Sequence, residues 1–203
     1  MRPTLYIALS LAALAAEPAF AHHAMDSRMP ATFAQGLLSG LGHPIIGLDH
    51  LAALIAVGCL AALQARGLWL ALAFVIAMVL GAALHVRELT LPGSEILAAL
   101  SVLVLGALLV PMRRLAVPIV LALFVAAGFV HGYALAESIV GAEPTPLFAY
   151  FVGLVIVQSA IALGAMLAVR AMTSEPGELA AVRLVGAGIA GIGIAILAQQ
   201  IAA

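Results

Sequence analysis

The chain has 203 residues, of which 66% are hydrophobic and 8% are charged, and its mean hydropathy is +1.25. This composition excludes an ordinary soluble domain and predicts several membrane spans. The formal net charge of −1 gives no basic surface, so nucleic acid is not an expected partner. The single cysteine, Cys59, excludes a disulfide framework and a cage of thiolate ligands for a metal.

Residues 1–21 have the pattern of a cleavable secretory signal peptide. Arg2 supplies the positive start, residues 5–16 supply an apolar core, and residues 19–21 match the small-residue pattern of a cleavage site. An uncleaved helix that anchors the chain is the alternative interpretation.

Cleavage at this site would leave residues 22–31 as an N-terminal segment in the periplasm of a Gram-negative bacterium. His22 and His23 would then lie next to a free amine, and these nitrogen donors suit the capture of a metal ion. A disordered tail is the alternative interpretation of this segment.

Residues 32–203 have room for six membrane spans of about 20 residues each, which would form one transmembrane permease domain. Apolar stretches alternate with short polar breaks, so the sequence predicts an all-α fold, a polytopic membrane helix bundle without a second soluble domain. Pairs of small residues, such as Gly36 with Gly40 and Gly128 with Gly132, are expected to let helices pack closely. The predicted spans are residues 32–64, 68–86, 91–110, 115–136, 146–169 and 179–202.

The arginines predict the orientation of these spans. If the mature N-terminus lies outside, the inner side carries more arginines than the outer side, as the positive-inside rule requires. We therefore expect a multi-pass protein of the bacterial inner membrane with a periplasmic N-terminus. The inner arginines would be Arg66, Arg113, Arg114, Arg170 and Arg183, and the outer ones Arg28 and Arg87.

The first predicted span is too long for one straight crossing. Residues 32–64 would form a helix of about 50 Å, whereas the hydrocarbon core is about 30 Å thick. Gly42, Pro44 and Gly47 favour a break near residues 42–47. Broken spans often form substrate sites, because unpaired backbone groups are tolerated only where they line a cavity. A surface helix leading into an ordinary span is the alternative.

Two groups of polar residues interrupt the apolar spans. His43, Asp49 and His50 lie in the first predicted span, and His131 lies near the end of the fourth, with Glu137 just after it. A carboxylate at the centre of a spanning helix costs about 2.5–3.5 kcal/mol on insertion scales, so a compensating cation is expected. At a rise of about 1.5 Å per residue, His50 and His131 lie at one depth in the outer third of the bundle.

Other polar residues near these spans are secondary candidates or have structural interpretations. His85 and Glu95 lie near the outer boundary and are secondary metal candidates; the alternatives are an interfacial anchor for His85 and a helix cap for Glu95. Gln158 and Ser159 are expected to form hydrogen bonds between helices.

Imidazole and carboxylate ligands without thiolate suit divalent first-row ions such as nickel, cobalt and zinc. Calcium or magnesium would require a site richer in oxygen. Because histidine binds a metal in its neutral form, occupancy of the site should fall in mild acid. The ion is expected as a transported substrate, and no permanently bound cofactor is expected.

The sequence His43-Pro44-x-x-Gly47-x-Asp49-His50 resembles the signature of the HupE/UreJ family of nickel permeases. The resemblance covers essentially the whole chain and implies uptake of nickel for hydrogenase or urease, or of cobalt in some members. Members often carry another histidine or polar residue where this chain has Leu135 and Ala136. The resemblance is supported by His131-Gly132-Tyr133-Ala134 and Pro144-Thr145-Pro146-Leu147, and it assigns metal-binding roles to His43, Asp49, His50, His131 and Glu137.

The expected function is therefore membrane transport of a divalent transition-metal ion, most of all nickel, with cobalt as the alternative. An accessory membrane protein that assists metalloenzyme maturation without transport is the alternative of another class. A haem enzyme or electron carrier is disfavoured by an aromatic content of 5%, and the sequence has no His-Glu-x-x-His protease motif, so no enzymatic activity is expected. The lipid bilayer is the expected partner, a homo-oligomer is left open, and no glycine-rich nucleotide loop indicates an ATPase.

Overall fold

The computed structural model describes residues 29–172 and 176–202. The predicted signal peptide lies outside these residues, and so does most of the segment 22–31, including His22 and His23. The predictions about those positions therefore stay predictions.

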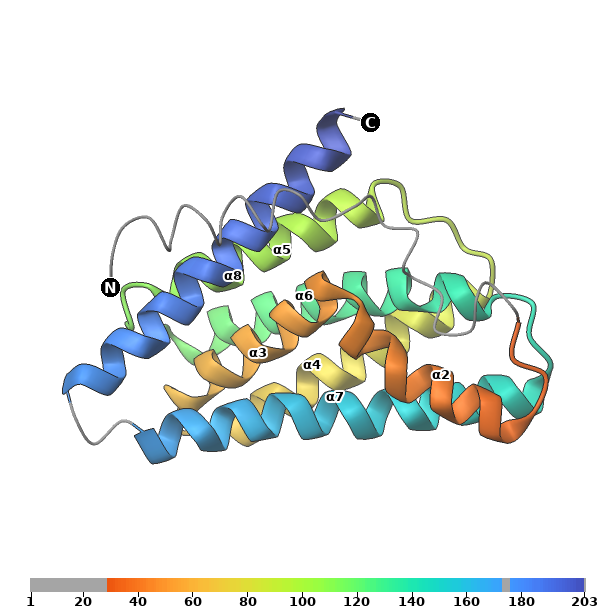
Figure 1. The fold of residues 1–203 in the computed structure, drawn as a ribbon, viewed down its shortest axis with the longest axis horizontal. Helices are drawn as coiled ribbons and strands as arrows, with labels where there is room; N and C mark the ends of the chain where they lie inside the picture. The colour runs from red at the N-terminus through yellow and green to blue at the C-terminus, as the bar shows by residue number, and fades with distance from the viewer. Residues whose placement is uncertain (1–28, 173–175, 203) are drawn as a thin grey trace.

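The described residues form helices and connecting turns, which make up the bundle shown in Figure 1 and confirm the predicted all-α class. The helices are α2 (Phe33–Ile46), α3 (Leu48–Ala62), α4 (Gly67–Val86), α5 (Ser94–Leu109), α6 (Val117–Leu135), the 3-10 helix η1 (Ala136–Ile139), α7 (Pro144–Met172) and α8 (Pro176–Ala202). Within this part of the chain, four segments are each long and apolar enough to cross a membrane, namely α4, α7, α8 and the joined α6 and η1. The bent pair α2 and α3 adds a fifth crossing if it is one span, so the bundle fits a multi-pass membrane protein.

The predicted third span is shorter than expected. Residues 91–110 were predicted to be helical throughout, but α5 contains 16 residues and begins only at Ser94. The turn before it places Glu88 and Gly93 at positive φ angles of 58° and 69°, which ends α4 and delays the start of α5. Because α5 is below the length of an ordinary crossing, the total of six spans stays a prediction.

The predicted break in the first span is confirmed. Helix α2 contains Pro44 and ends at Ile46, Gly47 is extended at φ −71° and ψ 106°, and α3 begins at Leu48 with a bend of 77° between the two helices. Proline cannot donate a backbone hydrogen bond, which weakens the last turn of α2. Asp49 lies in the first turn of α3, where a negative charge is favourable.

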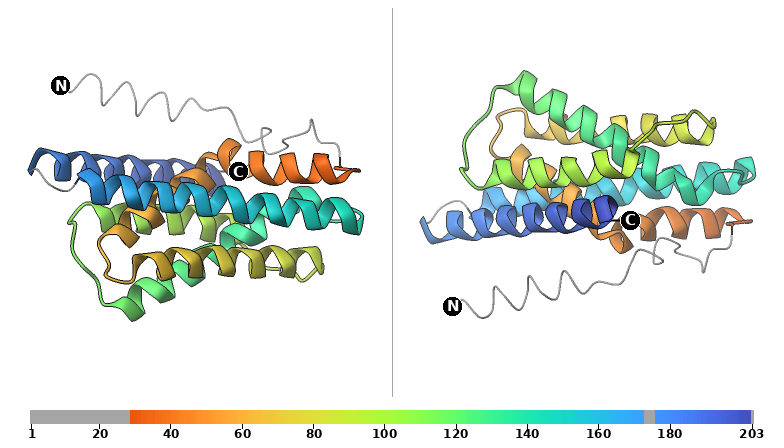
Figure 2. Two further views of the ribbon diagram at one scale, coloured as in Figure 1. Left: turned by 90° about the horizontal axis from the view of Figure 1, so that it is seen from below. Right: turned by 90° about the horizontal axis from the view of Figure 1, so that it is seen from above.

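Helix α7 lies along both halves of the broken span and runs in the same direction (Figures 1 and 2). Gly36 and Gly40 touch its backbone, and a Cβ atom on either would overlap the carbonyl oxygen of Pro146 or Tyr150. The predicted close packing at this glycine pair is therefore confirmed. We call the end of the bundle at which α2 and α7 begin the predicted outer end.

The remaining helices pair in a related way. Helices α4 and α6 run in the same direction, with Gly128 against Phe74 and Gly132 against Met78, whereas α5 and α8 run in opposite directions. Figure 2 shows α5 between α8 and α6. A 3 + 3 inverted repeat would relate the first, second and third predicted spans to the fourth, fifth and sixth. This relation turns the pairing of α2 and α3 with α7 into that of α6 with α4, and it leaves the pair of α5 and α8 unchanged. The observed pairs are therefore those that an inverted repeat requires.

The outside of the bundle is apolar, as a protein in contact with lipid requires. Trp69 on α4 is 70% exposed and Ile201 on α8 is 74% exposed, and Leu38 and Phe148 are also exposed. Patches of this kind are rare on soluble monomers. The interior instead holds Phe74, Phe124, Leu54 and Tyr150, all fully buried.

Candidate metal site

The break in the first span brings His50 against His131. His50 lies in the first turn of α3, His131 lies in α6, and their Nδ1 atoms are 2.8 Å apart. The two rings meet edge to face with centroids 5.0 Å apart, and both side chains are buried. The prediction that these two histidines lie at one depth is therefore confirmed.

Asp49 completes a group of three potential ligands. Its Oδ2 atom is 3.8 Å from Nε2 of His50, and one ligand atom from each of Asp49, His50 and His131 lies within 4.8 Å of the others. Nitrogen and oxygen ligands bind zinc-like ions at about 2.0–2.2 Å, so ligands of one ion lie about 3–4 Å apart. A small inward movement of these side chains would therefore let all three share one ion.

Ser101 of α5 fixes the tautomer of His131. Its hydroxyl donates to the carbonyl oxygen of Ala98 at 2.8 Å, so its oxygen accepts the hydrogen of His131 Nε2 at 2.9 Å. Nδ1 of His131 then carries a lone pair and accepts the hydrogen bond from His50. Hydrogen bonds of this kind orient histidines that ligate metals and hold them in the required tautomer.

His43 stands beside this group, and its ring is oriented by hydroxyl groups. The hydroxyl of Tyr150 donates to the carbonyl oxygen of Leu135 at 2.5 Å, and its oxygen accepts from Nδ1 of His43 at 3.1 Å. Ser138 Oγ also lies 3.0 Å from that nitrogen. In this tautomer the lone pair of His43 is on Nε2. The ring centroid lies 6.0 Å from that of His50, so His43 borders the three-residue group.

Gly47 leaves the space that the His50 ring occupies. A Cβ atom at position 47 would lie 2.7 Å from Cδ2 of His50 and 3.3 Å from Oδ1 of Asp49. The glycine of the motif is therefore required by the close approach of these two side chains.

Glu137 lies away from this group. It is exposed on η1, one residue after the end of the predicted fourth span, and it does not belong to the cluster of Asp49, His50 and His131. The next residue along the chain, Ser138, does contact His43. A metal-binding role for Glu137 stays a prediction.

The secondary candidates make contacts that connect helices. The ring of His85 stacks on Tyr133 at 4.0 Å, and its Nδ1 donates to the backbone oxygen of that residue at 2.6 Å, which ties the end of α4 to α6. Glu95 is exposed and accepts a hydrogen bond of 2.6 Å from Gln200, which ties α5 to α8.

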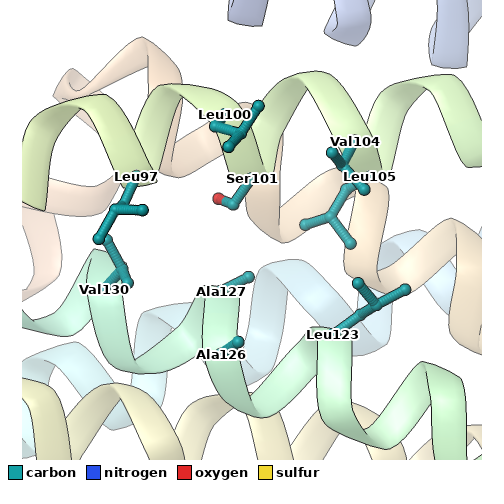
Figure 3. A pocket seen from close by; sticks show the side chains of 9 residues that line it. All are labelled: Leu97, Leu100, Ser101, Val104, Leu105, Leu123, Ala126, Ala127 and Val130. Carbon is teal, nitrogen blue, oxygen red and sulfur yellow. The ribbon is translucent and has the colours of Figure 1, made fainter.

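A cavity of about 190 Å³ opens between α5 and α6, as Figure 3 shows. Its lining is apolar apart from Ser101, the same residue whose hydroxyl contacts His131. The cavity therefore reaches the edge of the candidate site. Its other lining residues are Leu97, Leu100, Val104, Leu105, Leu123, Ala126, Ala127 and Val130.

Three residues of this site, Ser101, Ser138 and Tyr150, were missed by sequence reasoning. Each is a single hydroxyl in or next to an apolar helix, and such residues commonly hydrogen bond to their own backbone. The available signal was depth, because Ser101 lies seven residues into α5 and Tyr150 six residues into α7, both at the predicted outer end.

Comparison with known proteins matches residues 9–196 to the family described as HupE / UreJ protein. The chain belongs to the HupE/UreJ family. A curated relative, "Protein HupE" of Rhizobium leguminosarum bv. viciae, is 36% identical over 129 residues. That match covers 63% of this chain and 64% of the relative, so less than two thirds of the relative's length is matched. No solved structure matches the chain.

Proposed function

We propose that this HupE/UreJ protein takes up a divalent transition-metal ion, most of all nickel, through Asp49, His50 and His131. One observation carries the proposal: ligand atoms from two separate helices lie within 4.8 Å of one another inside an apolar bundle. The resemblance of the motif to nickel permeases supports nickel as the first ion, with cobalt as the alternative.

The donor set suits such an ion. Two imidazoles and one carboxylate match the ligand preference of nickel and cobalt, and no thiolate is needed. The carboxylate offsets part of the ion's charge, which lowers the cost of bringing a cation into the bundle. Remaining coordination positions would go to water, or to His43 at the border of the group.

We also propose that α5 is the third of six membrane spans. Helices α4 and α6 run in the same direction, so the chain between them must return to the other end of the bundle. Helix α5 is the helix in that segment, residues 87–116, and it packs against α8 in the opposite direction. This alternation supports six crossings despite the shortness of α5.

The orientation proposed for these spans places the mature N-terminus in the periplasm. Arginine placement supports it, and residues 1–21 would be removed as a signal peptide on export to the bacterial inner membrane. The candidate site would then lie nearer the periplasmic side, where the ion enters.

The direct test is uptake of radioactive Ni²⁺ by proteoliposomes that contain the purified full chain. We expect uptake above that of protein-free liposomes, and we expect Asp49→Asn to lose it while still inserting into the membrane. An excess of Co²⁺ should compete with Ni²⁺ for uptake. Preferential uptake of Co²⁺ would make cobalt the transported ion of the proposal and nickel the alternative. No uptake by a folded and inserted protein would contradict transport and favour the accessory role.

A further inference from the structure

Gln158, in the middle of α7, is a polar residue that the proposed site does not use. It is 0% exposed, and neither Oε1 nor Nε2 has a hydrogen-bond partner among the described residues. The expectation that Gln158 bonds across helices is therefore wrong within this part of the chain. A buried amide without partners is unfavourable, so its presence in a native protein requires an explanation.

The register of α7 against α3 places Gln158 just beyond the histidines. Gly58 is level with the turn 162–166 of α7, because a Cβ atom on Gly58 would overlap the backbone oxygen of Ala162 and lie 3.0 Å from the backbone nitrogen of Met166. His50 precedes Gly58 by about 12 Å along α3, and Gln158 precedes the middle of that turn by about 9 Å along α7. Since the two helices run in the same direction, Gln158 lies about 3 Å from the level of His50, toward the predicted inner end.

Gln158 also lies on the side of α7 that faces α3. Ala162 and Ala165 both approach Gly58, so they mark the face of α7 in contact with α3. At about 100° per residue, Gln158 is about 40° around the helix from Ala162 and about 20° from Ala165. Its amide is therefore on the same face as those contacts, one turn nearer to His50.

Helix α7 thus carries polar groups at two levels. Tyr150 contacts His43 at the predicted outer end, and Gln158 lies about 12 Å further along the same helix. An ion that leaves Asp49, His50 and His131 toward the inner end would meet the Gln158 amide next.

We propose that Gln158 is a second binding position for the transported ion, reached after the histidine site. The ligand is a partly hydrated divalent transition-metal ion, which the amide Oε1 binds directly or through a water molecule. A neutral amide holds such an ion more weakly than a carboxylate, and conduction requires binding weak enough for the ion to leave. This inference rests on the proposed transport function.

The test compares Gln158→Leu with the control Gln199→Leu, which changes an exposed glutamine of α8. For Gln158→Leu we expect Ni²⁺ uptake by proteoliposomes to fall at least about tenfold, because the ion loses its next position along the path. Calorimetric Ni²⁺ affinity in detergent should stay within about twofold of wild type, because the histidine site is intact. The midpoint of thermal unfolding should rise or stay unchanged, because an unsatisfied amide is replaced by an apolar side chain.

A second variant, Gln158→Glu, should retain the ion that wild type releases. We expect the number of tightly bound Ni²⁺ ions per chain to increase and uptake to slow. Wild-type uptake in Gln158→Leu would overturn the inference, and so would a loss of uptake accompanied by weaker Ni²⁺ binding or a lower unfolding midpoint. If the wild-type protein itself takes up no Ni²⁺, the proposed function fails instead.

Discussion

Two histidines outside α6 pack against that helix, and their surroundings differ sharply. His50 meets His131 edge to face, with Nδ1 atoms 2.8 Å apart and the Asp49 carboxylate 3.8 Å from its other nitrogen. His85 stacks flat on Tyr133 at 4.0 Å and donates to the backbone oxygen of that residue. The first histidine has neighbours that can share a cation, whereas the second has neighbours that fix the ends of two helices.

The difference shows that residue type and the helix contacted do not decide the role of a histidine in the bundle. Both lie near the predicted outer end, and either is a reasonable ligand by spacing alone. What separates them is the presence of other side chains that can ligate a metal. His50 has His131 and Asp49 beside it, whereas the printed contacts of His85 are the ring and the backbone oxygen of Tyr133. Variants of both regions can therefore test the distinction.

The largest effect is expected for His50→Ala. Loss of one of three ligands should reduce Ni²⁺ uptake by at least about 100-fold, because metal affinity depends on every ligand of a small site. Uptake by proteoliposomes and membrane insertion should be measured together. His85→Ala is the matched histidine control and should retain uptake. Equal loss in both variants would contradict the distinction between the two regions.

A smaller effect is expected for Ser101→Ala. The hydroxyl fixes the tautomer and orientation of His131, and loss of such a partner typically weakens metal binding by about 10–100-fold. Ni²⁺ titration of the purified protein measures this change. Ser159→Ala, a half-buried serine of α7 outside the site, is the control and should bind as wild type does. Unchanged affinity in Ser101→Ala would show that Ser101 does not position His131.

A variant at the break between α2 and α3 tests the packing around His50. In Gly47→Ala the new methyl group would lie 2.7 Å from the His50 ring, so the ring must move, at a cost of about 1–3 kcal/mol. We expect weaker Ni²⁺ binding and a lower unfolding midpoint. Gly164→Ala is the control, because nothing lies within 4 Å of a Cβ atom there. Equal stability and affinity in the two variants would contradict the packing argument.

The smallest effect on metal binding is expected for His85→Ala. Loss of the ring stack and one hydrogen bond should lower the free energy of unfolding by about 1–2 kcal/mol. The Ni²⁺ affinity should not change. Thermal unfolding in detergent and metal titration measure the two quantities separately. A tenfold loss of affinity without a loss of stability would instead assign His85 to the metal site.

The sequence predicts the parts of this structure that depend on one-dimensional spacing. Gly42, Pro44 and Gly47 locate the break, and counting residues from the ends of two spans places His50 level with His131. Both arguments work because a span has a fixed length and a fixed rise per residue.

The parts that depend on helix rotation were not predicted. Ser101 and Tyr150 reach the histidines only because α5 and α7 turn the relevant faces inward, and spacing within one helix does not determine that rotation. Glu137 illustrates the same limit, because a residue predicted as a ligand lies outside the cluster of Asp49, His50 and His131. It follows His131 by six residues, a spacing that puts it about 120° away on a regular helix, and it lies exposed on η1.

With α5 as the proposed third span, its shortness has a consequence for the surrounding lipid. Sixteen residues span about 24 Å, several ångströms less than the usual hydrocarbon thickness, so acyl chains beside α5 must compress or the flanking polar groups must lie deeper. Glu95 and Gln200, which join α5 to α8, sit at that edge. The bilayer should therefore be thinnest beside the helix that contributes Ser101, which would shorten the apolar barrier near the site.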